Sequence, residues 1–354
     1  MKHLKNRPYI IAEIGANHNG DIELAKKMIE EIKKSGADCV KFQIKIDPFE
    51  LGTKDYVVDL DSGNVVLENV NAWKDKKNNL HNIFDQINKY HFNKDDYRYL
   101  IDFANDLKLD VGASVFTTAG VDFVKKLDLK FIKMASMDLI NFHLINKVID
   151  SKLPLIASSG MASSEEIDLF VNYIKDKNYL DKSALLHCIS IYPPKSEILQ
   201  LKFIEELKKK YSLVIGHSDH TLGTIFSLIS IALGAEIIEK HFTLDKKLPG
   251  WDHKISVDPQ ELRELCVRAK EIKKSLGNNR KDISQEELDK RLKFRRSLTS
   301  AKDLEKGEII TEENLTYKRP GTGIPVNRFY EVLGKKVKNK IEKDKTLNWE
   351  DIDI

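Results

Sequence analysis

Cysteine and long apolar runs are both scarce in this chain of 354 residues. The three cysteines, Cys39, Cys188 and Cys266, are widely spaced and lie in apolar segments, so we expect buried thiols and neither disulfides nor a cysteine-ligated metal cluster. The uncharged run 221–235 is diluted by glycine, serine and threonine and is too short to span a membrane. It is therefore expected to be a buried helix.

An excess of charge of one sign is also lacking. The chain has 58 Lys and Arg against 55 Asp and Glu, a net charge of +3, and this balance argues against nucleic acid as the main partner. The basic start MKHLKNR is followed by PYIIAEIG, which is too short and too acidic for a signal peptide. The composition is typical of a soluble globular protein, and we expect a cytoplasmic location with no membrane partner.

Short apolar runs bounded by turn signals alternate with amphipathic segments up to about residue 245. Between the first two runs, Ile22, Ala25, Ile29 and Ile32 fall on one helical face. Such alternation indicates parallel βα units, and eight of them fit a closed (β/α)8 barrel. A doubly wound open sheet is the alternative, but no G-x-G-x-x-G follows the first run. The expected strands are 9–15, 39–43, 110–116, 131–136, 154–160, 184–190, 213–219 and 237–242.

The chain changes character on either side of these units. The polar insert 47–93 is expected to form loops with a helix at the barrel mouth, and 259–277 has the pattern of a final helix. Beyond it, 304–315 aligns without gaps to 341–352, which indicates a small pseudo-symmetric β-rich domain. We expect a barrel over 1–278, a linker over 279–295 and the small domain over 296–354.

Polar residues occupy the C-terminal end of nearly every expected strand, where the βα-loops of a barrel build its active face. Two lysines with several hydroxyls form an anion site suited to phosphate. Two histidines, His220 and His241, end neighbouring strands and could share a metal with water or substrate. Each residue alone also has a simple structural explanation, but their convergence favours a site. The strand-end residues are Glu13, Lys41, Gln43, Ser114, Lys133, Ser136, Asp138, Ser158, Ser159, Ser190, Tyr192, Ser218, Asp219, His220 and His241.

The last expected strand, IIEKHF, carries three polar residues in an apolar run. Period-two alternation places Glu239 and His241 on one face and Lys240 on the other. His241, near the end of the strand, is the candidate metal ligand. Because unpaired buried charge is costly, Glu239 and Lys240 are expected to form internal pairs and to take no part in catalysis.

Nine stretches carry a family pattern in order along the whole chain: AEIGANHNGD (12–21), GADCVKFQ (36–43), KMAS-x-D (133–138), ASSGM (157–161), HCISIYPP (187–194), IGHSDHTLG (215–223), GAEIIEKHFTLD (234–245), PGWDH (249–253) and KRPGTGI (318–324). In these stretches the chain resembles the N-acetylneuraminate (sialic acid) synthase family, enzymes that make nonulosonic acids. The resemblance implies a TIM barrel followed by a small antifreeze-like domain, also called the SAF domain.

The resemblance also implies a reaction and its ligands. Phosphoenolpyruvate (PEP) would condense with an open-chain N-acetylated amino sugar, and phosphate would leave by C–O cleavage. A divalent metal would assist, manganese first, with magnesium or cobalt as alternatives, in a domain-swapped homodimer. By resemblance the catalytic carboxylates are Glu13, Asp138 and Asp252; the PEP ligands are Lys41, Lys133, Ser114, Ser136, Ser158 and Ser218; the sugar ligands are Gln43, Ser190, Tyr192 and a partner's Arg319; and the metal ligands are His220 and His241.

Three departures from the family pattern bear on the sugar. Asp138 stands where S-x-E is common, Ser190 stands where users of N-acetylmannosamine have asparagine, and Trp251 adds bulk beside Asp252. Trp251 has packing under a loop as its simpler explanation. Together these departures indicate a modified sugar, such as a 2,4-diacetamido-trideoxyhexose that leads to a legionaminic- or pseudaminic-type acid.

Three other functions stay open from the sequence. A Schiff-base aldolase could use Lys133 or Lys240, but it leaves the histidine pair unexplained. A related PEP-dependent synthase could act on a sugar phosphate, although such relatives lack the C-terminal module. A non-catalytic carbohydrate-binding protein would leave the convergent strand ends without a purpose.

Overall fold

A computed structural model describes residues 8–46, 73–74, 80–81, 90–250, 252–277 and 280–353. The chain divides into two compact units, Met1–Gly277 and Asn278–Ile354. Trp251 and most of the insert expected over 47–93 lie outside the described residues.

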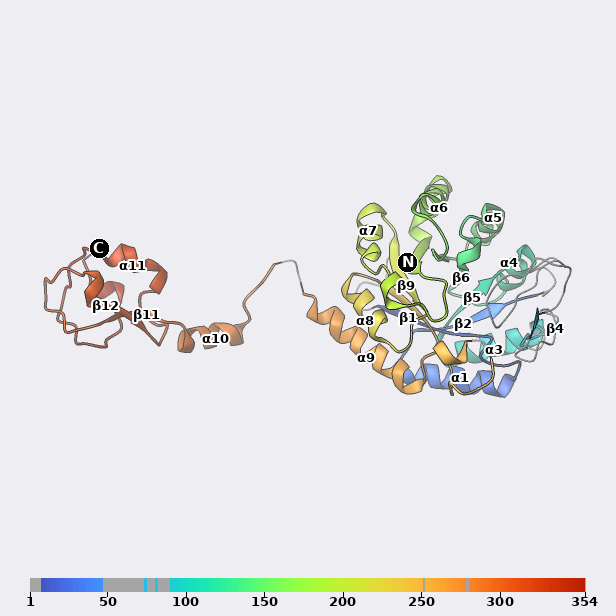
Figure 1. The fold of residues 1–354 in the computed structure, drawn as a ribbon, viewed down its shortest axis with the longest axis horizontal. Coiled ribbons are helices and arrows are strands. Elements are labelled where there is room, and N and C mark those ends of the chain that lie inside the picture. The colour runs from blue at the N-terminus through green and yellow to red at the C-terminus, as the bar shows by residue number, and fades with distance from the viewer. Residues whose placement is uncertain are drawn as a thin grey trace. The chain divides into compact units, whose positions relative to one another are not determined.

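Eight parallel strands of the first unit form a closed barrel in the order β1-β10-β9-β8-β7-β6-β5-β2 (Figure 1). This confirms the (β/α)8 barrel over the open sheet, and each strand lies within two residues of the bounds expected from its apolar run. The strands are β1 (Tyr9–Gly15), β2 (Cys39–Ile44), β5 (Asp110–Val115), β6 (Phe131–Met134), β7 (Leu155–Ser158), β8 (Ser183–Cys188), β9 (Val214–Asp219) and β10 (Ile237–His241). Two short strands, β3 (Trp73–Lys74) and β4 (Leu80–His81), pair with each other.

Helices surround the barrel, and polar caps fix where several of them begin. Asn93, Ser163 and Asp258 each begin a capping box, in which the side chain of this residue accepts from the backbone N–H three residues on. Its own backbone N–H donates in return to the side chain of that later residue. At the end of the first helix, Gly36 has φ +84°, the left-handed conformation that glycine adopts without strain. The helices are α1 (Ile22–Ser35), α3 (Lys94–Asp106), α4 (Thr118–Val124), α5 (Phe142–Asp150), α6 (Ser164–Asp176), α7 (Phe203–Lys210), α8 (Ile225–Ala232) and α9 (Pro259–Ser275).

The apolar run 221–235 does contain a helix, α8, but its burial differs from the expectation. Ser227 and Ser230 face the barrel and are fully buried, whereas Ile225 is 60% exposed. The serines lie inside because they hydrogen-bond to polar side chains of β9, Asp219 and His217. No helix in the described part of the chain is both long and apolar enough to cross a membrane.

The barrel interior is apolar at its base and polar above. A small core that includes Ile11, Cys39, Phe131, Ile156 and Ile237 fills the lower interior. Since side chains alternate along a strand, the next inward position lies two residues further on. That step leads to the polar residues Glu13, Lys41, Lys133, Ser158 and Glu239. The cysteines are buried thiols outside disulfides, as expected.

The second unit has its own apolar core and an internal pseudo-symmetry. Its elements include α10 (Gln285–Phe294), β11 (Ser297–Ser300), β12 (Leu315–Lys318) and α11 (Phe329–Val332), so part of the expected linker is helical. Leu304 and Ile341, the first residues of the two aligned segments, pair with each other in an antiparallel bridge. Short 3-10 turns, Glu312–Asn314 and Trp349–Asp351, occupy equivalent places in the two segments.

Candidate active site

A cavity of about 260 Å³ lies at the C-terminal ends of the barrel strands. It brings together most of the residues singled out in the sequence, although they come from strands far apart along the chain. Those residues are Glu13, Lys41, Gln43, Ser114, Lys133, Ser136, Ser158, Tyr192, Ser218, His220, His241 and Asp252. Phe116, Ala135, Met137, Cys188 and Glu239 complete the lining.

Each buried lysine of the cavity is held by a serine on the neighbouring strand. Lys41 Nζ of β2 donates to Ser114 Oγ of β5 at 2.8 Å, and Lys133 Nζ of β6 donates to Ser158 Oγ of β7 at 2.6 Å. Lys133 also donates to the Met134 carbonyl oxygen. These bonds fix both ammonium groups in a buried position, which prepares them to bind an anion.

Glu239 is a cavity residue that the sequence reasoning left out of the site. The expected internal pairing is present, since its Oε1 atom accepts from Ser218 Oγ at 2.8 Å and its carboxylate lies 3.4 Å from Lys41 and 3.9 Å from Lys133. The pairing, however, takes place inside the cavity. The sequence did contain a signal for placing Glu239 in the cavity, because alternation puts it on the same face of the strand as His241.

The charges in the cavity compensate one another. Burial lowers the pKa of the Lys41 amine to about 8, and the charge of Glu239 opposes this shift. Burial acts to raise the pKa of Glu239, but the charges of Lys133 and Lys41 outweigh it and lower that pKa to about 2. Lys41 also forms an ion pair with Glu13. Near neutral pH, the Lys41 ammonium group is therefore paired with carboxylates in the cavity.

The two histidines have the chemistry of metal ligands. His220 Nδ1 lies 3.0 Å from the Ile189 carbonyl oxygen, so a proton on Nδ1 leaves the lone pair on Nε2 free to bind a cation. His241 Nδ1 is buried and makes no hydrogen bond, and it lies 3.7 Å from Asp252. The ring centroids are 5.5 Å apart. Two nitrogen donors with a nearby carboxylate fit a divalent cation that takes its other ligands from water or substrate.

The protonation of the two histidines differs. Burial lowers the pKa of His241 to about 4, so its ring is neutral at physiological pH. For His220, burial opposes the charged form, but contacts with Cys188 and the Ile189 carbonyl raise its pKa. Within the described residues, no group of three or more His, Cys, Asp or Glu side chains could hold a metal by itself.

Tyr192 covers this pair of rings. Its ring centroid is 4.0 Å from that of His220 and 6.1 Å from that of His241. Burial raises the pKa of the Tyr192 hydroxyl, which therefore stays neutral and is able to donate a hydrogen bond. The phenol lies where it could orient a sugar next to a metal bound by the histidines.

Three of the residues proposed by resemblance do not line the cavity. Asp138 receives a hydrogen bond from Asn141 at 2.9 Å, and burial raises the pKa of its carboxyl. Ser190 Oγ lies 3.9 Å from Cys188 Sγ, beside the cavity wall. Arg319 belongs to the second unit, where its guanidinium lies over the Phe294 ring. Lys240 faces away from the cavity, as expected from alternation, and pairs with Asp219 at 3.1 Å.

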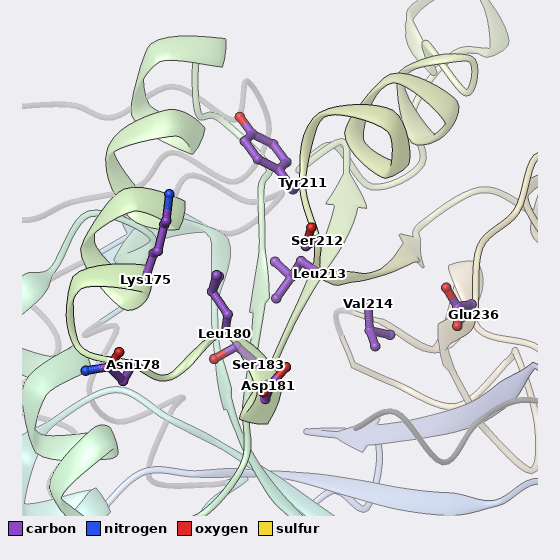
Figure 2. Close-up of a pocket in the computed structure, with 10 residues that line it drawn as sticks. All are labelled: Lys175, Asn178, Leu180, Asp181, Ser183, Tyr211, Ser212, Leu213, Val214 and Glu236. Atoms are coloured by element: carbon purple, nitrogen blue, oxygen red, sulfur yellow. The ribbon is translucent and has the colours of Figure 1, made fainter.

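A second hollow, of about 620 Å³, lies at the opposite end of the barrel (Figure 2). Its side chains include Lys175 near the end of α6, Ser183 at the start of β8 and Val214 at the start of β9. Despite its larger volume, it has neither the paired lysines nor the histidines. Because barrel enzymes place their chemistry at the C-terminal ends of the strands, the smaller cavity is the candidate active site.

Comparison with known proteins identifies the family of this chain. Residues 28–281 match the NeuB family, and residues 295–353 match the SAF domain. The chain belongs to the NeuB family. The N,N'-diacetyllegionaminic acid synthase of Legionella pneumophila is 34% identical over 98% of this chain and 94% of its own length. The corresponding synthase of Campylobacter jejuni is 36% identical over 96% of this chain and 98% of its own length.

A solved structure agrees with this membership. The N-acetylneuraminic acid synthetase of Leptospira borgpetersenii, crystallised with citrate, has 32% sequence identity and a TM-score of 0.69. The match covers 80% of this chain and 90% of that one. NeuB-family relatives of this chain are sugar-acid synthases, which supports an enzyme built on a TIM barrel with a C-terminal SAF domain.

Proposed function

We propose that this NeuB-family protein condenses PEP with the open-chain form of an N-acetylated amino sugar and releases phosphate by C–O cleavage. The observation that carries the proposal is a single cavity containing two serine-held lysines and two histidines with available ring nitrogens. The lysines suit the two anionic groups of PEP, and the histidines suit a cation that binds the sugar. No other described cavity combines these groups.

Lys41 and Lys133 are assigned to the phosphate and carboxylate of PEP. Their present partners are Glu13 and Glu239, and the charge of Glu239 opposes the lowering of the Lys41 pKa before an anion arrives. An entering anion exchanges part of this pairing for charge-assisted hydrogen bonds to the same lysines. The hydroxyls assigned to PEP with them are those of Ser114, Ser136, Ser158 and Ser218.

His220 and His241 are assigned to a divalent cation, Mn²⁺ first. When bound, such a cation would act as a Lewis acid at the carbonyl of the open-chain sugar. Tyr192 and Gln43, which line the same cavity, would orient the sugar hydroxyls. The tilted ring of Tyr192 over His220 also keeps water away from one side of the pair.

The carboxylates are assigned to charge stabilisation and proton transfer. As C3 of PEP bonds to C1 of the sugar, positive charge develops on C2, and Glu13 and Glu239 stabilise it. Water then adds to C2, and its proton passes to Asp252, which lies beside His241. Asp252 passes this proton to the former aldehyde oxygen, which became an alkoxide when C3 bonded to C1. The bond between C2 and the bridging oxygen breaks next, as the C2 hydroxyl becomes a carbonyl and its proton leaves with the phosphate, whose charge the lysines stabilise.

We infer that the sugar is a 2,4-diacetamido-trideoxyhexose. The two legionaminic acid synthases above match this chain over nearly its whole length. Asp138 and Ser190 differ from the residues of N-acetylmannosamine users, but neither lines the cavity, so the relatives carry this assignment. Arg319 is assigned to the N-acetyl group of a sugar bound by a partner subunit, in a domain-swapped dimer.

A Schiff-base aldolase is the competing mechanism. Lys240 lies outside the cavity, and the Lys133 amine is engaged by the Ser158 hydroxyl and the Met134 carbonyl oxygen. Borohydride reduction in the presence of substrate tests this directly. A trapped adduct on Lys133 would favour the aldolase, and the absence of one is expected.

The deciding experiment measures phosphate release from PEP with Mn²⁺ and a panel of sugars: 2,4-diacetamido-trideoxyhexoses, N-acetylmannosamine and its 6-phosphate. PEP labelled with ¹⁸O at the bridging oxygen should yield labelled phosphate, as C–O cleavage requires. We expect release that depends on the diacetamido sugar and disappears in His241→Ala. Release with none of the sugars would overturn the proposed reaction, and preference for N-acetylmannosamine or its phosphate would overturn the proposed sugar.

A further inference from the structure

A buried ion pair on the outer side of the barrel wall joins the residues that directly precede the two histidines. Asp219 and Lys240 are Cα partners in the ladder between β9 and β10. Lys240 Nζ lies 3.1 Å from Asp219 Oδ2, and both side chains are completely buried. His220 and His241 are the next residues in their respective segments.

Lys240 also reaches the other side of His220. Its ammonium group donates to the carbonyl oxygen of Thr221, so one lysine contacts the residues on both flanks of this histidine. Asp219 completes the arrangement, because its Oδ1 atom accepts from Thr221 N at 2.8 Å. The segment 219–221 is thus attached to the strand that carries His241.

Helix α8 anchors the same pair from outside the barrel. Ser227 donates to Asp219 Oδ2 at 2.5 Å, and this second acceptor contact fixes the direction of the carboxylate. On the inner face, Glu239 and Ser218, the preceding pair in the same ladder, are also hydrogen-bonded. The two strands are therefore tied on both faces just before each histidine.

We propose that the Asp219–Lys240 pair positions His220 and His241 relative to each other for cation binding. The inference rests on the proposed metal site. Burying an ion pair gains little stability over packing apolar side chains of similar volume. The pair does fix the conformation of the segment 219–221. The Lys240 ammonium group donates to acceptors on both sides of His220, and only one arrangement of the segment satisfies them all. Groups that orient metal-ligating histidines typically affect metal affinity ten- to a hundredfold.

The test compares the folded full-length protein with the double variant Asp219→Asn/Lys240→Met. Asparagine keeps one oxygen acceptor, for Thr221 N, and its amide N–H can donate to the Ser227 hydroxyl in place of the bond that this hydroxyl gave to Asp219. Methionine keeps most of the volume of lysine, so no unpaired charge is buried. Mn²⁺ binding is measured by electron paramagnetic resonance, and melting temperature by calorimetry. We expect Mn²⁺ affinity to fall ten- to a hundredfold with a small change in melting temperature.

Ser230→Ala is the matched control. It removes a buried hydrogen bond between α8 and β9, to His217, without touching the residues that flank His220. We expect a lower melting temperature and unchanged Mn²⁺ affinity. If the double variant does not fold, Ser227→Ala replaces it, because it releases the Asp219 carboxylate without burying an unpaired charge, and a measurable loss of Mn²⁺ affinity is expected.

The outcomes separate the two proposals. If the wild type and the folded double variant, or the variant that replaces it, bound Mn²⁺ with equal affinity, the positioning role would be overturned and the metal site would stay intact. Absence of Mn²⁺ binding in the wild type, or unchanged binding in His241→Ala, would overturn the metal site and the positioning role with it. A crystal structure of the variant checks the cause, since the separation of the His220 and His241 rings, now 5.5 Å, should change.

Discussion

The Nζ atom of Lys41 lies 3.4 Å from Glu239 Oε2, with both side chains buried in the cavity. The carboxylate opposes the lowering of the Lys41 pKa, which burial brings to about 8. Glu239 thus helps to keep a positive charge where the proposed substrate is anionic. A carboxylate beside an anion-binding site would normally repel the anion. Here the Glu239 carboxylate favours the protonated form of the Lys41 amine, which is the form that binds an anion.

The first prediction concerns the pH dependence of PEP binding. Lys41 loses its proton as pH rises through about 8, so PEP affinity should fall above this pH. Glu239→Gln removes the opposing charge and should start this fall at lower pH. A shift of one pKa unit corresponds to about tenfold in affinity at high pH. Titration calorimetry between pH 7 and 9, where the phosphate is fully ionised, measures it.

Glu236→Gln is the control for this prediction. Glu236 precedes β10 and pairs with Lys208 at 3.1 Å, outside the cavity. Its replacement should leave the pH profile of PEP binding unchanged. If Glu239→Gln and the wild type gave the same profile, the link between Glu239 and Lys41 would be wrong.

The second prediction concerns Gly160, which follows β7. A Cβ atom at this position would lie 2.1 Å from Ser190 Oγ and 2.7 Å from Ser136 Oγ. Gly160→Ala should displace both hydroxyls and reduce kcat/KM ten- to a hundredfold, because small misplacements at a site are costly. Gly120→Ala in α4 is the control, since its Cβ would meet ordinary contacts of 3.5 Å or more. Steady-state kinetics decide, and equal activity of both variants would contradict the argument.

The barrel could be predicted from the sequence because its signal is local and repeated. Each apolar run, such as 213–219, is bounded by turn residues, and the observed strand Val214–Asp219 has almost the same limits. The ungapped alignment of two segments near the end of the chain likewise predicted an internal pseudo-symmetry. In the structure Leu304 and Ile341, the first residues of these segments, pair with each other. The burial of α8 could not be predicted, because hydropathy does not reveal that its serines have partners on β9.

The site was predicted less completely, and the reasons are geometric. Alternation puts Glu239 on the same face as His241 and Lys240 on the other, but it does not by itself say which face points inward. The inward phase follows from the closed barrel, where Ile237 belongs to the interior core and Glu239 lies two residues further on. Asp138 and Ser190 were expected in the cavity from their places at the ends of strands and in the family motifs. A motif does not report whether a loop turns its side chain toward the cavity.

The third prediction concerns acid stability. Burial lowers the pKa of His217 in the folded state to about 3, against 6.5 for an ordinary histidine. Between these values the unfolded chain binds the proton and the folded chain does not, so stability is present above pH 6.5 and is lost as pH falls. From pH 7 to pH 5 this histidine should cost about 2 kcal/mol of unfolding free energy. Burial places the pKa of His18 at about 3 as well, which adds a similar loss.

Urea unfolding at pH 7 and pH 5 tests this expectation. His217→Gln cannot take up the proton, so the difference between the two pH values should shrink by about 2 kcal/mol. His143→Gln, on the exposed face of α5, is the matched control and should leave the difference as in the wild type. A pH dependence unaffected by His217→Gln would show that another group causes the acid loss.

The last prediction concerns Arg319, whose proposed partner is the N-acetyl group of the sugar. Arg319→Ala should raise the KM for the sugar about tenfold or more while leaving PEP affinity unchanged, because a lost charge-assisted hydrogen bond costs about 1.5–3 kcal/mol. Arg328→Ala, at an exposed ion pair with Glu331 in the same unit, should have no effect. Arg319 also lies over the Phe294 ring of α10, so Phe294→Leu separates sugar contact from local packing. If Phe294→Leu reproduced the whole defect, or if PEP affinity fell in Arg319→Ala, the direct role of Arg319 at the sugar would be wrong.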